Sequence, residues 1–153
     1  MKIGIISDTH DNLPKIKNAV ELLNQHQPDL VIHAGDYVSA FSLDPYSALN
    51  CEWTGVFGNN DGDHAALAKK SRGRIKPGPL LISPEGRKIA VMHEFAACSE
   101  ADIIICGHTH LPRIEHCSGQ LILNPGEVSG WLYGRSSLII LDLSSLTPEL
   151  IKF

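Results

Sequence analysis

The first 36 residues, MKIGIISDTHDNLPKIKNAVELLNQHQPDLVIHAGD (1–36), decide the fold. Residues 2–6 and 30–33 are short apolar runs of the kind that forms buried strands. Between them, Pro14 favours a helix start, and apolar residues then recur at helical spacing to about residue 25. Because a strand, a helix and a second strand follow one another, we predict a β-α-β unit with parallel strands and a right-handed crossover.

The remaining sequence continues with α/β character and then becomes mostly β. Parallel α/β structure followed by antiparallel strands predicts two packed sheets with helices outside them. No linker interrupts this pattern, so we expect residues 1–153 to form a single domain. The expected helices span 41–49, with Pro45 inside, and 61–70, which begins at an acidic capping residue; the expected strands span 51–57, 80–83, 88–93, 103–106, 113–116, 120–123, 138–143 and 149–153.

The charge balance and the apolar segments argue against several classes of function. With 13 basic and 17 acidic residues the net charge is −4, which argues against an extended nucleic-acid-binding surface and against a membrane-binding surface. No segment is apolar for long enough to be a signal-peptide core or a membrane span. The four cysteines show no metal-binding spacing, so we expect a cytoplasmic protein with reduced thiols and with Cys106 in the core.

Polar side chains follow five of the expected strands directly, where each strand ends. In open α/β sheets, ligands bind beyond the carboxyl ends of the strands. Taken alone, His93 would be an ordinary hydrogen-bonded histidine, and Asp36 or Asn59 a turn residue. Leaving several such groups buried and unpaired would cost about 1–3 kcal/mol each, which favours one shared site. The seven candidate metal ligands are Asp8, His10, Asp36, Asn59, His93, His108 and His110.

These residues occur in motifs that resemble those of a known family. The motifs are SDTHD (7–11), HAGD (33–36), GNND (58–61), the His93 position, GHTH (107–110) and NPGE (124–127). In order and spacing they are similar to those of the calcineurin-like metallophosphoesterases, especially the small single-domain phosphodiesterase-like branch. The resemblance implies an α/β fold, a four-layer α-β-β-α sandwich of two mixed sheets. It also implies two metal ions, one held by Asp8, His10, Asp36 and His110 and the other by Asp36, Asn59, His93 and His108, with Asp36 bridging.

The chemistry of these ligands agrees with a hydrolytic metal centre. Imidazole, carboxylate and amide ligands without thiolate suit two divalent ions among manganese, nickel, iron, cobalt and zinc. Such a pair lowers the pKa of a bridging hydroxide, which can attack phosphorus in line with the leaving group. We therefore expect a metal-dependent phosphoesterase that acts on a small phosphorylated substrate, and the resemblance favours a phosphodiesterase. Asn60 and Asp61 are expected to contact the substrate or the leaving group.

Two positions depart from the pattern of the family. Many relatives have a histidine where this chain has Asn60, and that histidine is thought to assist the leaving group. An amide can donate a hydrogen bond but cannot transfer a proton, so we expect a preference for substrates with good leaving groups. After His93, relatives commonly continue with glycine and a longer helical segment. Here Glu94 follows, which we expect to face solvent, and residues 94–102 allow two helical turns at most.

Three questions remain open at the level of sequence. A protein-interaction scaffold of the same fold, like a subunit of the retromer complex, is the alternative to an enzyme, and a homo-oligomer is compatible with either. His33 either orients a metal ligand from behind or makes a hydrogen bond in the core. Trp131 and Tyr133 either line a substrate pocket or a subunit contact or, as we expect, simply pack in the structure.

Overall fold

The β-α-β unit forms as expected in the computed structural model, which describes residues 1–153. β1 (Lys2–Ile6) pairs in parallel with β2 (Leu30–His33), and α1 (Leu13–His26) connects them. The side chain of Asn12 caps this helix by accepting a hydrogen bond from the Lys15 amide. One face of α1 is buried in an apolar cluster against the sheet, and its buried residues include Ile16, Ala19 and Leu23.

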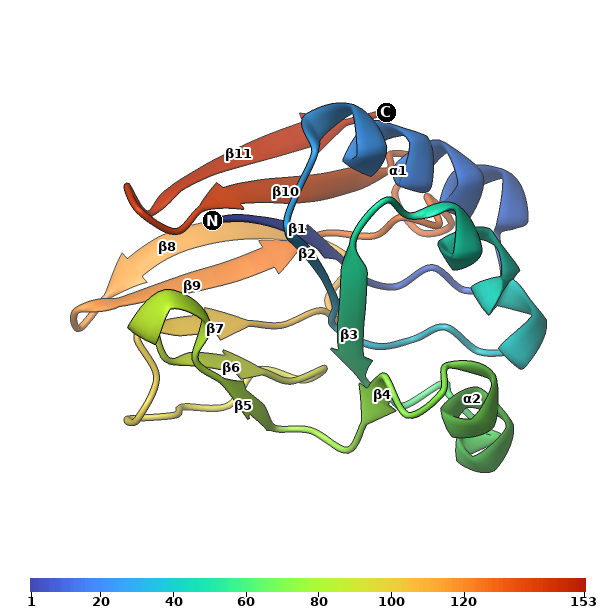
Figure 1. Ribbon diagram of the computed structural model, residues 1–153, viewed down its shortest axis with the longest axis horizontal. Coiled ribbons are helices and arrows are strands. Elements are labelled where there is room, and N and C mark those ends of the chain that lie inside the picture. Colours follow the sequence, from blue (N-terminus) through green and yellow to red (C-terminus); the bar gives the residue numbers. More distant parts are fainter.

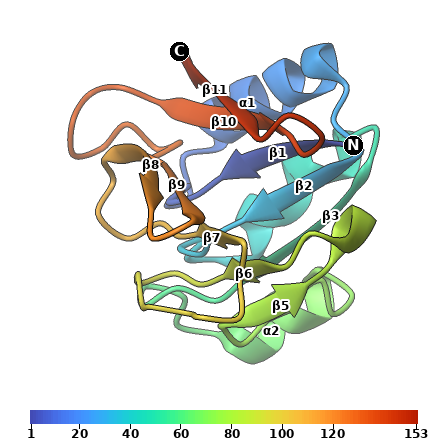
Figure 2. The same cartoon turned by 90° about the vertical axis from the view of Figure 1, so that its left-hand side faces the viewer.

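Two mixed sheets carry the rest of the chain (Figure 1). The first sheet has the strand order β11-β10-β1-β2-β3-β4, and the second has the order β5-β6-β7-β9-β8. In Figures 1 and 2 the helices α1 and α2 lie on one side of the first sheet, and the second sheet lies on its other side. The further elements are the 3₁₀ segment η1 (Ala40–Ala48), β3 (Glu52–Val56), α2 (His64–Lys70), β4 (Ile75–Lys76), β5 (Leu80–Ile82), the 3₁₀ turn η2 (Pro84–Gly86), β6 (Ile89–Val91), β7 (Ile103–Ile105), β8 (Pro112–Cys117), β9 (Gln120–Pro125), β10 (Ser137–Asp142) and β11 (Thr147–Lys152).

Side chains that alternate along the strands fill two apolar layers. Ile3 and Ile5 of β1 pack between the sheets in one cluster with Ile103 and Ile105 of β7. Ile6 belongs instead to the cluster that α1 and η1 cover. The strands of the first sheet are therefore apolar on both faces, as a sheet with a covering layer on each side requires. This arrangement confirms the expected α/β fold of two mixed sheets with helices.

The outer face of the second sheet is covered without a helix. The apolar cluster on this face includes Ile104 and Ile122. Ala101, which belongs to the cluster, and Cys98, which packs against it, lie in the connection between β6 and β7. Residues 94–102 contain no helix. β6 and β7 are parallel, and a helical crossover between parallel strands usually needs a dozen or more residues. The sandwich therefore keeps both sheets and the helices of the first sheet, while its fourth layer is irregular chain that forms no helical turn.

Smaller differences from the sequence-based expectations concern element boundaries. The second helix begins at His64 instead of Asp61, because Asp63 is its N-cap and accepts a hydrogen bond from the Ala66 amide at 2.8 Å. β4 is a two-residue edge strand that no pattern indicated. The expected hairpin is confirmed, with Leu80 of β5 opposite Val91 of β6 in an antiparallel pair. None of the helices has both the length and the apolar character needed to traverse a bilayer.

Candidate metal centre

The loops that follow β1, β2, β3, β6 and β7 meet at one end of the two sheets. The Asp8 amide donates to the Gly35 carbonyl at 3.0 Å, which joins the loops after β1 and β2. The Gly107 amide donates to the His93 carbonyl at 2.9 Å, which joins the loops after β6 and β7. The His108 amide donates to the Asp8 carboxylate at 3.1 Å and so ties the second sheet to the first. These bonds place all seven expected ligands in two adjoining groups.

The first group consists of Asp8, His10, Asp36 and His110. One ligand atom from each residue lies within 4.8 Å of every other. His10 Nε2 lies 3.4 Å from Asp36 Oδ2 and 3.3 Å from His110 Nε2, and His110 Nε2 lies 3.4 Å from Asp8 Oδ1. Asp8, Asp36 and His110 are buried, while His10 is partly exposed. The four side chains therefore surround a single small space.

The second group adjoins the first through Asp36. His93 Nε2 lies 3.4 Å from Asp36 Oδ2, the same oxygen that His10 approaches. Asn59 Oδ1 lies 2.8 Å from His93 Nε2 and 2.9 Å from His108 Nδ1. Asn59 and His108 are exposed, so this group opens to solvent on one side. One carboxylate oxygen is thus common to both groups, and it belongs to Asp36, the residue that the family resemblance implies as a bridging ligand.

Atoms with lone pairs face each other in both groups, which is the arrangement that a cation needs. His93 Nδ1 lies 2.8 Å from the Ala34 carbonyl, which can only accept a proton, so Nε2 of the neutral ring turns a lone pair toward the Asn59 carbonyl. Asp8 Oδ1 is buried and has no hydrogen-bond partner. Buried acceptors of this kind are rarely left without a partner. The donor set therefore fits divalent metal ions of the type that imidazole and carboxylate bind.

The charges in the two groups are strongly coupled. Burial alone would raise the pKa of Asp36, but the neighbouring His93 and hydrogen bonds from Asn60 outweigh burial and hold the pKa well below its ordinary value. Burial alone would lower the pKa of His93 and of His10. Asp36 beside His93, and Asp8 and Asp36 beside His10, outweigh burial and raise both pKa values. The pocket therefore favours positive charge next to its two carboxylates.

A carboxylate behind His110 fixes the orientation of that ring. His110 Nδ1 lies 2.8 Å from Glu127 Oε2, so Nε2 is left to face Asp8. The same carboxylate accepts hydrogen bonds from the hydroxyl of Ser129 at 2.8 Å and from the Tyr133 amide at 2.9 Å. Burial opposes the ionisation of Glu127, but these hydrogen bonds outweigh it and lower the pKa. Glu127 was not among the expected site residues, although its motif NPGE was noted.

Glycines in three of the motifs allow the backbone to approach the ligands. A Cβ on Gly58 would collide with the Asp36 carboxylate, and one on Gly107 would collide with the side chains of Ser7 and Asp8. Gly35 has φ of +100°, a conformation that side chains rarely adopt, and a Cβ there would meet the ring of His93. Steric exclusion of any side chain therefore explains the glycine that precedes the polar residues in HAGD, GNND and GHTH.

The structure separates the roles of Asn60 and Asp61. Asn60 is exposed and reaches the centre: its backbone amide and its Nδ2 donate to the two oxygens of Asp36 at 2.8 and 2.7 Å. Asp61 is only 4% exposed, and its carboxylate accepts hydrogen bonds from the amides of Gly58 and Val38, both at 2.7 Å. Asp61 therefore ties the loop after β2 to the turn after β3. Its carboxylate is occupied by backbone amides, so the expectation that it contacts a substrate is wrong.

His33 and Glu94 lie outside the ligand groups. His33 is fully buried, its Nδ1 accepts a hydrogen bond from the Gly35 amide at 3.1 Å, and its ring stacks on Tyr37 at 3.8 Å. Burial lowers the pKa of His33 well below its ordinary value. His33 therefore supports the loop that carries Asp36, and makes no direct contact with a ligand side chain. Glu94 is exposed, as expected.

The aromatic residues after the NPGE motif border the centre. Trp131 is 64% exposed and its Nε1 donates to the His10 carbonyl at 3.1 Å, while Tyr133 is 50% exposed. The expectation that both simply pack in the structure is therefore wrong. Tyr133 instead lines a cavity of about 320 Å³ whose wall includes His110. Cys106 is buried as expected, and all four cysteines are unpaired.

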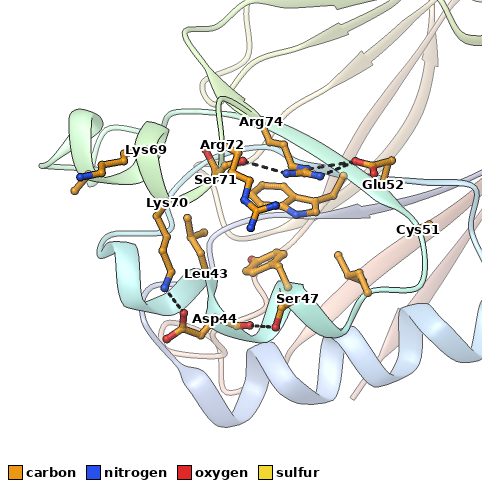
Figure 3. Close-up of a pocket in the computed structure, with 14 residues that line it drawn as sticks. Leu43, Asp44, Ser47, Cys51, Glu52, Lys69, Lys70, Ser71, Arg72 and Arg74 are labelled. Carbon is orange, nitrogen blue, oxygen red and sulfur yellow. Dashed lines mark hydrogen bonds and ion pairs between the residues drawn. The ribbon is translucent and has the colours of Figure 1, made fainter.

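A larger cavity, of about 1020 Å³, lies between η1, β3 and the end of α2 and contains none of the seven ligands (Figure 3). Two of its cations are neutralised, because Lys70 pairs with Asp44 and Arg74 pairs with Glu52. Lys69 and Arg72 also lie at this cavity and have no acidic partner. The larger of the two cavities is thus not the one that adjoins the candidate metal ligands.

The fold and the centre together define a class of protein: an α/β sandwich of two mixed sheets with a cluster of metal-binding side chains at the strand ends. The family model of the calcineurin-like phosphoesterase superfamily domain matches residues 1–146. The chain belongs to this family.

Relatives and solved structures agree with this assignment. The chain is 36% identical over 154 residues to phosphodiesterase MJ0936 of Methanocaldococcus jannaschii, with 93% of each chain covered. The structure of an archaeal phosphodiesterase superposes with a TM-score of 0.93 at 32% identity and covers 100% of both chains. Vps29 of Entamoeba histolytica, in complex with Zn²⁺, superposes with a TM-score of 0.72 at 20% identity, covering 100% of this chain and 98% of that one. The last similarity is one of fold alone.

Proposed function

We propose that this protein is a metal-dependent phosphodiesterase that hydrolyses small phosphodiesters with two divalent ions. Asp8, His10, Asp36 and His110 would hold one ion, and Asp36, Asn59, His93 and His108 the other. The observation that carries the proposal is the position of Asp36 Oδ2, which lies 3.4 Å from the ring nitrogens of both His10 and His93. Manganese, nickel, iron, cobalt and zinc all suit these ligands.

The side chains of the centre leave a net positive charge once metal is bound. Asp8 and Asp36 bring two negative charges, whereas Asn59 and the histidines coordinate as neutral groups. Two divalent ions would therefore leave about two positive charges in the pocket, which attracts a phosphate diester even on a chain of net charge −4. When bound, the ions supply Lewis-acid activation of water and of the phosphoryl oxygens.

Asn60 limits which substrates react well. Its side-chain amide is exposed next to Asp36, so it can donate a hydrogen bond to a phosphate in the pocket. No histidine, cysteine, lysine or tyrosine stands at this position to give a proton to the leaving oxygen. Such help is typically worth about 10²–10⁴-fold in rate. Phosphodiesters with activated aryl leaving groups should therefore react much faster than those with alkyl leaving groups.

A scaffold that binds other proteins is the second candidate function, and one observation favours it. Trp131, Leu132 and Tyr133 form an exposed apolar loop beside the centre. We favour the enzyme, because a scaffold has no need for seven converging ligands or for a buried Asp8 oxygen that lacks a partner. The unpaired state of all four cysteines supports a cytoplasmic location in our proposal.

The test is metal removal followed by the addition of Mn²⁺ or Ni²⁺, with hydrolysis of bis-p-nitrophenyl phosphate as the assay. We expect activity to return with metal, to be absent from Asp36→Ala, and to be kept by Asp44→Ala, the same substitution in the remote cavity (Figure 3). Activity that survives Asp36→Ala would show a contaminant and defeat the proposal. Metal uptake without hydrolysis would instead favour the scaffold, and no metal uptake would exclude both the dinuclear centre and its chemistry.

A further inference from the structure

The cavity of about 320 Å³ adjoins the metal centre through His110. His110 contributes its Nε2 to the first ligand group and also forms part of the cavity wall. The lining also includes Arg135 and Ser136, which precede β10, Ser137 at its start, and Lys152 of β11. A group attached to a phosphate at the metal centre can therefore extend into this cavity. The volume suits a sugar or a phosphate but not a polymer.

Two cations in this cavity lack partners. Arg135 and Lys152 are both exposed at the cavity and neither makes a hydrogen bond or an ion pair through its side chain. Lys69 and Arg72 at the remote cavity also lack partners, but the acidic residues Asp44 and Glu52 line that cavity. No acidic residue lines the cavity that adjoins the metal centre. On a chain with more acidic than basic residues, two unpaired cations in one small cavity indicate a site for an anion.

A buried hydroxyl in the same cavity also lacks a partner. Ser136 is fully buried, and its Oγ has no hydrogen-bond partner in the protein. Most buried hydroxyl groups are hydrogen-bonded, but this one lies against Gly130, which is outside the cavity lining, so the anion site rests on Arg135 and Lys152. Tyr133 lines the same cavity and is half exposed, and its amide is anchored to Glu127. Its ring offers a flat surface to a ring of the ligand.

We infer that this cavity binds a second phosphate, carried as a monoester on one arm of the phosphodiester that is cleaved. The preferred substrates are then nucleotide-like diesters with an additional phosphate. The inference rests on the proposed function. The Arg135 guanidinium can take a phosphate through two parallel hydrogen bonds, and Lys152 adds a compact positive charge. Neither Arg135 nor Lys152 is a proposed metal ligand. The two cations should therefore change kcat/KM only for substrates that carry the second phosphate.

A matched pair of chromogenic substrates tests this inference. The first is thymidine 5′-(p-nitrophenyl phosphate), and the second is the same compound with a 3′-phosphate. We expect kcat/KM to be about 10- to 100-fold higher for the 3′-phosphorylated compound, the range that hydrogen bonds to charged groups give. The ratio of the two kcat/KM values should fall about 10-fold in Arg135→Gln and in Lys152→Gln.

Two variants in the remote cavity serve as matched controls. Arg72→Gln and Lys69→Gln remove the same charges from residues that also lack partners, and both residues lie at the cavity of Figure 3. They should leave the ratio unchanged. Calorimetry with thymidine 3′,5′-bisphosphate gives a readout independent of turnover: Arg135→Gln should bind it about 10-fold more weakly than the native protein and than Arg72→Gln.

The outcomes separate this inference from the proposed function. If neither compound is hydrolysed with metal present, the proposed function fails. If both are hydrolysed at equal kcat/KM and Arg135→Gln changes nothing, the phosphate site is wrong while the phosphodiesterase stands. If the control variants lower the ratio as much as Arg135→Gln does, the effect is the general field of the protein and the local site is likewise wrong.

Discussion

The hydrogen bonds of Glu127 make it a sensitive point at which to perturb the metal centre. Its Oε2 faces His110 Nδ1 and the hydroxyl of Ser129, both at 2.8 Å. Its Oε1 accepts from the amides of Leu132 at 3.1 Å and Tyr133 at 2.9 Å. Glu127 is only 1% exposed, so water cannot replace a lost acceptor. Both carboxylate oxygens are therefore needed as acceptors.

The substitution Glu127→Gln leaves one acceptor where two are needed. If the new NH₂ group faces His110, it donates to Nδ1 and moves the ring proton to Nε2, the nitrogen that faces Asp8. If it faces the amides of Leu132 and Tyr133, two buried donors lose their acceptor. We expect metal affinity to fall about 10- to 100-fold, as for other residues behind a metal ligand. The free energy of unfolding should also fall by about 1–3 kcal/mol.

Two measurements check the two parts of this prediction separately. Calorimetric titration with Mn²⁺ gives metal affinity, and urea unfolding of the metal-free protein gives stability. Glu149→Gln, the same change at an exposed glutamate, should alter neither value. Native metal affinity together with native stability in Glu127→Gln would refute the argument that this carboxylate orients His110. A loss of stability alone would leave Glu127 a purely structural residue.

Three further predictions concern Asn60, Gly107 and the cysteines. Asn60→His should raise kcat on alkyl phosphodiesters by up to about 10²-fold relative to aryl diesters and should add a limb to the pH–rate profile; an unchanged ratio would contradict the assigned lack of proton transfer. Gly107→Ala should weaken metal binding and destabilise the fold by about 1–3 kcal/mol through the clash with Ser7 and Asp8, whereas Gly62→Ala, with nothing within 4 Å, should not. In alkylation with iodoacetamide at pH 8, followed by mass spectrometry, exposed Cys117 should react first and Cys106 last, because burial raises the pKa of Cys106 to about 11; equal rates would refute this.

Apart from β4, the sequence predicted the strands, and it predicted which residues gather as candidate ligands at the strand ends. Ligands that follow a buried strand directly can be placed, because the carboxyl ends of parallel strands meet at one edge. Asp8, Asp36 and His108 are of this kind, and the structure brings them together with the other four expected ligands. The β-α-β unit was equally clear from its apolar periodicity.

The errors concern residues whose role depends on contacts between distant segments. Glu127 meets His110 only because β8 and β9 pair with Pro112 opposite Pro125, a register that the spacing of the motifs does not contain. The pattern indicates a capping or substrate-binding role for Asp61, but its carboxylate accepts hydrogen bonds from amides of the loop after β2 and of its own turn. Trp131 and Tyr133 looked like packing residues because aromatic side chains are usually buried, and only the fold shows that their loop borders a cavity.

The conformation of the ligand loops indicates how the centre obtains its affinity. Asp8, Asp36 and His108 have φ of 54°, 64° and 67°, values that cost about 1–3 kcal/mol each for residues other than glycine. Backbone hydrogen bonds between the loops and the close approach of Gly58 and Gly107 hold this geometry, although the ligand atoms themselves offer mostly lone pairs to one another. The fold thus assembles the site before a cation enters, and the binding of a cation would add to the free energy of unfolding by mass action. Asn60 supplies no metal ligand, and in Asn60→His its backbone amide still donates to Asp36 Oδ1, so the exchange changes proton transfer while Asp36 loses only the side-chain hydrogen bond to Oδ2.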